Sequence, residues 1–583
     1  MELQYKLSIP EPHTHIAHIT INAKRESSDK YLDFFIPSWS PGSYLMREYG
    51  RNIRVFLAFS KLGERLVTTQ IDKGIYRIDF ANSELKSHAE LEFSVKYEIF
   101  CHELTVRTSH IDQSHAFIHG PSTFMGVLGK EMLSPQLEIE INPLWSKITT
   151  GLTDISNKRE VFLYSAKDYD EFIDCPIEIG CHETDGFMAD GKPHELAFYG
   201  QYLNNGISET KVKEDIKKVV EHILKTMGGA PYDRYVFMTH LAPSLFGGLE
   251  HLNSTALQYC SYEFSQEKGY KGWLELVAHE FFHLWNVKRI RPIELGPFDY
   301  TNEALTRMHW LTEGLTSFMD QYFIFRTDFY SLQDYLDCFK TSINRYQQTP
   351  GRKYHSAEDS SFNSWIKLYR PDENSNNSSV SYYLKGGLIF MVLHFRLLSK
   401  GKGVLDLVDA LWKRYQENPK VGLVEEEVFE MIRAIAGEKI RDEFVFLVKG
   451  VDEIDFETLF NGLGIDFEYE DAKADLGINV EFKGDRVVVK SVRADSSAYR
   501  CGLNAGDEIL SVNGLRFLKS DYDNRDKIFL ENKRYTLLVS RLGNIITQEI
   551  LVEKGLRSVK SIKVRDGIDT KELSAKLKGS MPN

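Results

Sequence analysis

The sequence predicts a multidomain α+β protein in which two β-rich regions enclose a mixed region and a helical one. Short runs of alternating apolar and polar residues fill residues 1–200. Near Ser208 the apolar spacing lengthens to that of a helix, and it stays helical over residues 331–460. Short alternation returns over residues 465–555. The chain of 583 residues is long enough for about three or four domains of ordinary size.

Residues 1–200 are expected to form a β-sandwich-like domain. The strand candidates share β-branched and aromatic residues bounded by turn residues. They are Ile16–Ala23, Leu32–Ile36, Leu66–Ile71, Leu91–Ile99 and Gln136–Ile141. A Pro-Gly turn between aromatic residues, in the segment Trp39–Tyr44, predicts a rigid loop, and the simplest interpretation of this loop is a packed corner.

Residues 201–330 combine helices and strands. Lys211–Met227 places its apolar side chains on one helical stripe. Tyr235–His240 has the composition of a strand, and Leu249–Gln258 is a further strand candidate. A helix that includes Trp273–Glu280 follows them.

Residues 331–460 are predicted to form a helical domain. Its helices are Leu332–Tyr346, Ser381–Leu398, Val404–Tyr415, Glu425–Ile435 and Arg441–Val448. The polar run Asn374–Ser379 between them is expected to be a solvated loop.

The C-terminal region returns to β structure. Within residues 465–555, strands are expected at 484–492, 535–540 and 545–552, with a short helix at 524–531. From Lys554 onward the chain is basic and has few large apolar residues. Residues 556–583 are therefore expected to be a tail with partly mobile ends.

Composition narrows the class of protein. No apolar run approaches the roughly 18 residues that a membrane-spanning helix requires, and the N-terminus lacks the basic and apolar segments of a signal peptide. The six cysteines are widely scattered, which fits a reducing compartment better than a disulfide scaffold. The net charge of −13 disfavours nucleic acid as a partner. We therefore expect a cytoplasmic protein with no membrane span.

The most informative motif is His279-Glu280-Phe281-Phe282-His283, an HExxH pattern within a predicted helix. Residues four apart lie on one face of a helix, so the two imidazoles can bind a single cation. Glu280 lies beside them, where it can act as the general base for a metal-activated water. His279 and His283 are therefore predicted zinc ligands.

A third ligand is needed, because catalytic zinc usually takes three protein ligands and leaves its fourth position to water. Glu313 lies in a second helix-like segment, Trp310–Asp320, and is the candidate. Among the acids nearer to the HExxH motif, Glu303 competes with it on spacing alone, ahead of Glu294 and Asp299.

The HExxH motif followed by Trp-Leu-Thr-Glu-Gly at 310–314 resembles the gluzincin metallopeptidases. The resemblance implies that Glu313 closes the metal site and that Asp320 accepts a hydrogen bond from a ligand imidazole. Upstream, Gly247-Gly248-Leu249-Glu250 resembles the exopeptidase motif of gluzincin aminopeptidases, in which the acid binds the free α-ammonium of the substrate. Glycines in an extended segment also permit close backbone approach, and a buried ammonium requires a counter-charge. His251, which follows, receives no assignment.

A fourth motif lies further along the chain. Ser381–Gly387 resembles the Tyr-x-Lys-Gly motif of the same enzymes. The resemblance implies that Tyr383 donates a hydrogen bond to the oxyanion that develops on the substrate. Tyr382 is the adjacent alternative, but neighbours on a helix point about 100° apart, so only one of them can face the metal.

The segment Gly502–Gly514 resembles the signature of a PDZ domain, and this resemblance covers residues 465–555. Together with the Pro37–Tyr44 segment, the motifs in this order resemble the glycyl aminopeptidase family over essentially the whole chain. The resemblance implies an N-terminal β domain (1–200), a thermolysin-like α/β catalytic domain (201–330), a helical domain (331–460) and a PDZ domain. It also implies a zinc cofactor and a preference for N-terminal glycine and, more weakly, alanine.

The expected function is the zinc-dependent removal of small N-terminal residues from peptides with a free N-terminus. Two alternatives remain open. One is a metallo-endopeptidase with the same metal site. The other is an adaptor with a vestigial peptidase site, whose PDZ unit binds protein C-termini at the loop Leu476–Ile478.

Overall fold

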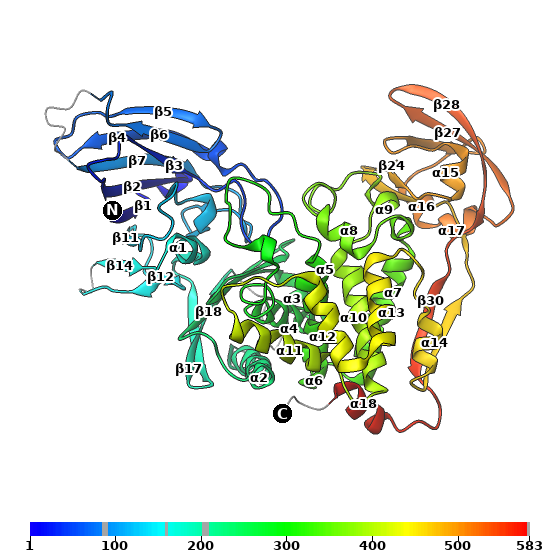
Figure 1. Ribbon diagram of the computed structural model, residues 1–583. Coiled ribbons are helices and arrows are strands. Elements are labelled where there is room, and N and C mark those ends of the chain that lie inside the picture. Colours follow the sequence, from blue (N-terminus) through cyan, green and yellow to red (C-terminus); the bar gives the residue numbers. More distant parts are fainter. Residues whose placement is uncertain (84–90, 158–160, 201–208, 580–583) are drawn as a thin grey trace. The chain divides into compact units, whose positions relative to one another are not determined.

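The computed structural model describes residues 1–83, 91–157, 161–200 and 209–579 (Figure 1). The expected domain boundary between residues 200 and 201 falls at the end of a described range. The last four residues of the expected tail lie outside the described residues. The chain divides into two compact units. Unit 1 comprises Met1–Ala304 and Trp412–Gly422, and unit 2 comprises Leu305–Leu411 and Leu423–Asn583. Within the described ranges we find no helix with the length and apolarity needed to cross a membrane.

The N-terminal part of unit 1 is built from three sheets, which confirms the predicted β domain. The largest has the order β13 (Thr153–Asp154), β14 (Phe162–Ser165), β11 (Gln136–Glu140), β1 (Leu3–Ser8), β2 (Ile16–Lys24), β7 (Glu92–Phe100) and β4 (Ile53–Ser60). The second has the order β10 (Gly126–Val127), β3 (Tyr31–Phe35), β6 (Ile75–Asp79) and β5 (Val67–Asp72). The third has the order β12 (Lys147–Thr150), β15 (Ile177–Gly180), β9 (His115–Ile118) and β8 (His110–Ile111). Their alternating apolar residues share one core, to which Tyr5, Phe34 and Ile177 contribute fully buried side chains.

The second part of unit 1 is a mixed five-stranded sheet with helices against it. Its order is β16 (Glu183–Ala189), β17 (Lys192–Tyr199), β18 (Tyr235–Ala242), β20 (Ser254–Cys260) and β19 (Gly247–Glu250). The three central strands are parallel and the two outer strands are antiparallel to their neighbours. Helices α2 (Glu209–Met227), α3 (Ser261–Phe264) and α4 (Glu267–Phe282) accompany it (Figure 1). The ring of Phe281 on α4 meets that of Tyr235 on β18 edge to face, with centroids 5.0 Å apart.

The helical part of unit 2 has α10 (Tyr382–Leu398) at its centre, because this helix is apolar on almost every face. The helices are α5 (His309–Thr312), α6 (Gly314–Arg326), α7 (Leu332–Gln347), α8 (Ala357–Phe362), α12 (Glu425–Ala436), α13 (Glu438–Lys449) and α14 (Phe456–Asn461), and α11 (Val404–Glu417) divides between the units. The ring of Trp310 stacks on Phe390 and Phe429. The polar run Asn374–Ser379 was expected to be a loop, but it contains one helical turn, α9 (Ser375–Ser378).

The PDZ unit forms a sheet of order β23 (Ile478–Lys483), β24 (Arg486–Val492), β25 (Glu508–Val512), β27 (Arg534–Arg541) and β28 (Asn544–Leu551), with β26 (Leu515–Arg516) paired to β25. Strand β22 (Ala474–Asp475) pairs separately with β29 (Glu553–Lys554). The helices are α15 (Ser497–Cys501), α16 (Lys519–Asp523) and α17 (Arg525–Ile528). In place of the single helix expected at 524–531 there are two short ones, and the first of them ends before residue 524.

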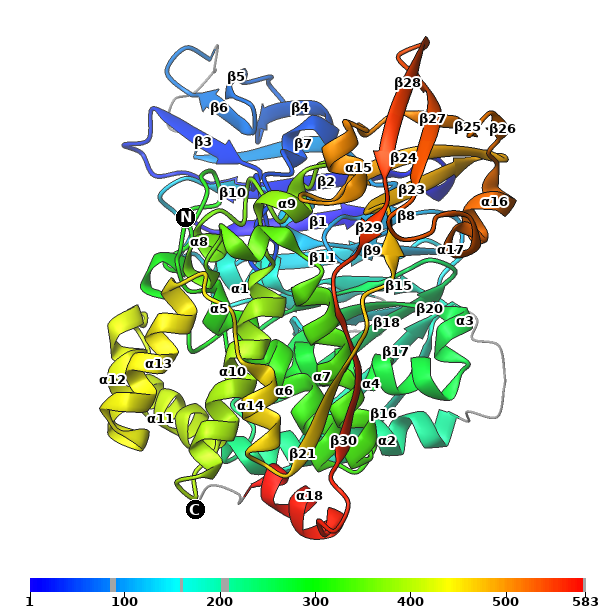
Figure 2. The ribbon, with the colours of Figure 1, turned by 90° about the vertical axis from the view of Figure 1, so that its right-hand side faces the viewer.

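The chain after Lys554 differs most from expectation, because it is folded rather than a tail. Strand β30 (Ser558–Val564) pairs antiparallel with β21 (Ile465–Glu470), and the two run side by side in Figure 2. Helix α18 (Thr570–Lys578) buries Leu573 and Leu577, and the Leu577 carbonyl oxygen lies 2.9 Å from His394 Nε2. A few well-spaced apolar residues therefore suffice to pack this segment.

Candidate active site

The two histidines of the HExxH motif lie at the C-terminal end of α4 with their rings facing each other. His279 Nε2 and His283 Nε2 are 3.0 Å apart. His283 Nδ1 lies 2.6 Å from the carbonyl oxygen of Asn286, which can only accept a hydrogen bond. In the neutral ring, the proton is therefore on Nδ1 and the lone pair of Nε2 points toward His279. A metal-binding imidazole needs this tautomer, with one nitrogen free to bind the ion and the other N–H held by an acceptor. The pair therefore fits a zinc ion.

Glu280 packs against the backbone of β19, and this contact explains why residue 248 is a glycine. A Cβ built on Gly248 would lie 1.9 Å from Glu280 Oε1, far inside van der Waals contact. Only glycine at this position leaves room for the carboxylate where it lies, which agrees with the close approach expected of an extended glycine pair. Arg107 of the β domain donates a hydrogen bond of 3.1 Å to the Gly248 carbonyl oxygen and so holds the strand in place.

Glu250 ends β19, and the residue is only 3% exposed. Its Oε1 atom has no hydrogen-bond partner among the described residues. One polar atom each of Glu250, Glu280 and His283 lie within 4.8 Å of one another. Two buried carboxylates this close repel each other and are costly to desolvate unless a cation lies beside them. The arrangement therefore favours binding of a positively charged group next to the HExxH motif.

His251, which the sequence left without a role, joins a partly buried charge cluster centred on Asp174 at the end of α1 (Tyr169–Asp174). Asp174 Oδ1 accepts from Lys288 Nζ at 2.7 Å and lies 3.2 Å from His251 Nδ1, while Oδ2 accepts from the Leu252 N–H at 2.8 Å. Burial raises the pKa of Asp174, but the charges of Lys288 and His251 outweigh it and lower the value to about 2. The cluster ties the end of β19 to the segment that follows α4.

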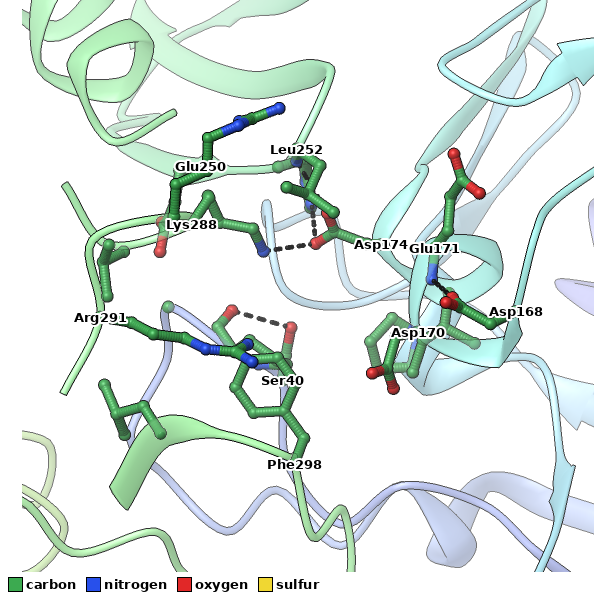
Figure 3. Close-up of a pocket in the computed structure, with 18 of the residues that line it drawn as sticks. Ser40, Asp168, Asp170, Glu171, Asp174, Glu250, Leu252, Lys288, Arg291 and Phe298 are labelled. Atoms are coloured by element: carbon green, nitrogen blue, oxygen red, sulfur yellow. Dashed lines mark hydrogen bonds and ion pairs between the residues drawn. The ribbon is translucent and has the colours of Figure 1, made fainter. Parts of the chain in front are cut away.

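A cavity of about 500 Å³ opens beside Glu250, and Figure 3 shows part of its lining. Lys288 and Leu252 converge on Asp174 at one side, and Ser40 and Phe298 lie at another. Trp39 and Tyr44 also line the cavity although both are buried. The loop interpreted from sequence as a packed corner is therefore a corner that also walls this cavity.

Unit 2 carries the other predicted residues. Glu313 lies between α5 and α6 and is 2% exposed, whereas the three competing acids are exposed: Glu294, Asp299 and Glu303. Directly after it, Gly314 meets Gly386 of α10, since a Cβ on Gly314 would lie 2.7 Å from Gly386 Cα. The glycines of the two motifs, Gly314 and Gly386, thus let α6 and α10 cross with their backbones in contact.

Tyr383 lies in the first turn of α10, with its hydroxyl 3.3 Å from that of Tyr369. Burial, and then the negative charge of Glu313, raise the pKa of Tyr383 well above its usual value, so the phenol stays protonated and able to donate. Tyr382 packs on the ring of His309 instead, with centroids 5.1 Å apart. Asp320 is buried rather than exposed on the helix surface, and its predicted contact with a ligand imidazole stays a prediction.

A second buried cluster lies in unit 1 outside the HExxH site. Glu178 Oε1 is 2.7 Å from His115 Nδ1, and Oε2 is 2.9 Å from His240 Nε2. Burial raises the pKa of Glu178, but the charges of the two histidines outweigh it and lower the value to about 2. Each carboxylate oxygen has an imidazole partner, so a hydrogen-bonded network that links β15 to β9 and β18 accounts for the cluster.

Comparison with known proteins identifies this fold as that of a peptidase. A family model described as M61 glycyl aminopeptidase matches residues 272–389, one described as the peptidase M61 N-terminal domain matches 4–181, and a PDZ domain model matches 488–529. The chain belongs to the M61 glycyl aminopeptidase family. No curated protein matches it in sequence.

Solved structures are similar to this chain over different lengths. An aminopeptidase N family protein from Idiomarina loihiensis is 25% identical, with a TM-score of 0.89 over 99% of this chain and 100% of that one. An M1 zinc metallopeptidase from Deinococcus radiodurans is 10% identical, with a TM-score of 0.47 over 78% of this chain and 94% of the other. Native yeast LTA4 hydrolase is 13% identical, with a TM-score of 0.48 over 79% of this chain and 70% of its own.

Proposed function

We propose that this protein is a zinc-dependent aminopeptidase that removes small N-terminal residues, glycine and alanine, from peptides. The observation that carries the proposal is the buried carboxylate of Glu250, close to Glu280 and His283; no described residue bonds to its Oε1. A substrate α-ammonium is the cation that such a carboxylate needs. The similarity to an aminopeptidase N family protein over the whole chain supports the same activity.

In this proposal, His279, His283 and Glu313 hold the zinc ion. The tautomer of His283 supports the first two assignments. Glu313 is preferred because it is the buried acid among the candidates. When bound, zinc supplies Lewis acidity that lowers the pKa of water toward ~7.

The protein's own groups perform the remaining steps. Glu280 takes the proton of the attacking water and passes it to the leaving amine. Glu250 pairs with the substrate α-ammonium, so that only the first peptide bond reaches the nucleophile. The protonated phenol of Tyr383 donates to the oxyanion, and Asp320 orients a ligand imidazole.

The role of the PDZ unit is a separate part of the proposal. The Gly477 N–H, which lies in the loop expected to hold a terminal carboxylate, already donates to Asp475 Oδ1 at 3.0 Å. Asp475 Oδ2 in turn accepts from Arg493 at 2.7 Å. A peptide C-terminus would have to displace an internal carboxylate, so this arrangement favours the peptidase over the adaptor as the main function. All six cysteines are unpaired, and we propose a cytoplasmic location on that basis.

The test is hydrolysis of glycyl, alanyl and leucyl anilides, each with a free and with an acetylated N-terminus, before and after chelation and zinc restoration. We expect hydrolysis of the free glycyl and alanyl substrates, loss with chelator, and recovery with zinc. Equal rates on acetylated substrates would favour the endopeptidase. No hydrolysis of any substrate after zinc restoration, together with no bound metal, would favour the adaptor.

A further inference from the structure

The Trp39–Tyr44 loop of the β domain makes a contact with Glu250 that the proposed mechanism does not use. A Cβ built on Gly42 would lie 2.5 Å and 2.6 Å from the two carboxylate oxygens of Glu250, and 2.7 Å from a methyl carbon of Leu249. Ordinary carbon–oxygen contacts are longer by more than half an ångström. The backbone of Gly42 therefore lies directly on the carboxylate and covers one side of it.

The loop is held where it is by hydrogen bonds that involve its backbone and its polar side chains. Just before the loop, the Ser38 N–H donates to the Tyr300 carbonyl oxygen at 2.8 Å. Within it, the indole N–H of Trp39 donates to the Asp299 carbonyl oxygen at 2.9 Å. Ser40 Oγ lies 3.1 Å from His119 Nε2. Trp39 is fully buried. With these anchors, the loop cannot yield easily, so a larger residue at position 42 would displace Glu250 rather than the loop.

Position 42 also has a backbone that favours glycine. Its φ angle is +82°, in the left-handed region that residues with a Cβ rarely adopt. Gly63, in the same domain, has φ +81° but no atom within 4 Å of its built Cβ. The two glycines thus share the strain of a substitution and differ in the contact with Glu250.

We infer that Gly42 is a positioning residue of the α-amino subsite: it limits the Glu250 carboxylate to one conformation, in which the carboxylate receives the substrate's ammonium group. This inference rests on the proposed aminopeptidase function and adds the β domain to its substrate-binding site. A carboxylate held still before binding loses less conformational entropy when the ammonium arrives. The recognised group is a primary ammonium at the end of a peptide.

The test compares Gly42→Ala with Gly63→Ala as its matched control. A shift of about 1 Å in a binding group can cost on the order of 100-fold in rate. We therefore expect Gly42→Ala to lower kcat/KM on glycyl anilide about 10- to 100-fold, mainly through KM. Gly63→Ala should stay within about twofold, because the strain it shares with Gly42→Ala acts on stability alone. Thermal unfolding of both variants measures that strain.

A double-mutant cycle separates positioning from a structural defect. In a Glu250→Ala background the carboxylate is gone, so adding Gly42→Ala should change glycinamide affinity, measured by calorimetry, less than about twofold. An equal loss in both backgrounds would overturn the inference, as would Gly42→Ala behaving like Gly63→Ala.

Ser40→Ala provides a second variant if Gly42→Ala does not fold. It removes the contact with His119 and adds no atoms, and we expect it to raise KM about threefold in the native background and not at all with Glu250→Ala. An unchanged KM in the native background would also overturn the inference. Wild-type protein without aminopeptidase activity would refute the proposed function itself. An active wild type together with an unchanged kcat/KM in Gly42→Ala would refute only this role of Gly42.

Discussion

Gly248→Ala should remove most of the activity although it deletes no group that takes part in the reaction. A Cβ at position 248 would lie 1.9 Å from Glu280 Oε1, 2.4 Å from Cδ and 2.6 Å from Cγ. Because ordinary contact needs about 3.2 Å, the carboxylate must move by more than 1 Å, and a displacement of that size costs on the order of 100-fold. We therefore expect kcat to fall about 100-fold, equivalent to about 2.7 kcal/mol of barrier.

The KM and the metal content distinguish this effect from unfolding. The imidazoles of His279 and His283 are positioned by the end of α4 and do not depend on where the Glu280 carboxylate lies. The zinc stoichiometry should therefore remain that of the wild type. The KM should change less than about threefold, because the base acts in the transition state. Gly462→Ala, whose nearest neighbour is at an ordinary 3.4 Å, is the control. A kcat within threefold of wild type would show that Glu280 does not need its observed position.

Three further variants test other parts of the structure. Glu280→Gln should retain zinc and lose at least ~100-fold in kcat, since general base catalysis contributes about 10²–10⁴-fold; normal turnover would exclude Glu280 as the base. The pKa of Glu178 is about 2, below its ordinary 4.5, so its stabilising effect is complete above pH 4.5 and is lost as the pH falls toward 2. Glu178→Gln should therefore flatten the acid side of a pH series of urea unfolding, and an unchanged slope would contradict the pairing. Asp475→Ala should free the Gly477 N–H and strengthen binding of a free peptide C-terminus over its amide about fivefold by calorimetry; equal affinities would rule this loop out as the carboxylate site.

Local patterns predicted the elements whose structure depends on neighbouring residues. The helix α2 and the strand β18 form where the spacing of their own apolar residues predicts them. The HExxH spacing placed two imidazoles on one face of α4, as observed. These features depend on residues a few positions apart, which is the range over which helix and strand geometry acts.

The misses involve segments whose structure depends on distant partners. The chain after Lys554 has few apolar residues, but β30 gains its hydrogen bonds from β21, about a hundred residues earlier. The break at Glu313 divides one predicted helix into α5 and α6. Neither partner can be identified from local spacing.

By itself, the sequence determined the order of the domains, the helix of the HExxH motif and the residue types of a metallopeptidase. Only the tertiary structure decided which groups surround Glu250. It brought Gly42 against that carboxylate from more than 200 positions away, and it joined Asp174 to Lys288 in a partly buried ion pair. The physical reason is that excluded volume and charge pairing act between atoms that touch, and contact across distant segments leaves no periodic trace in the chain.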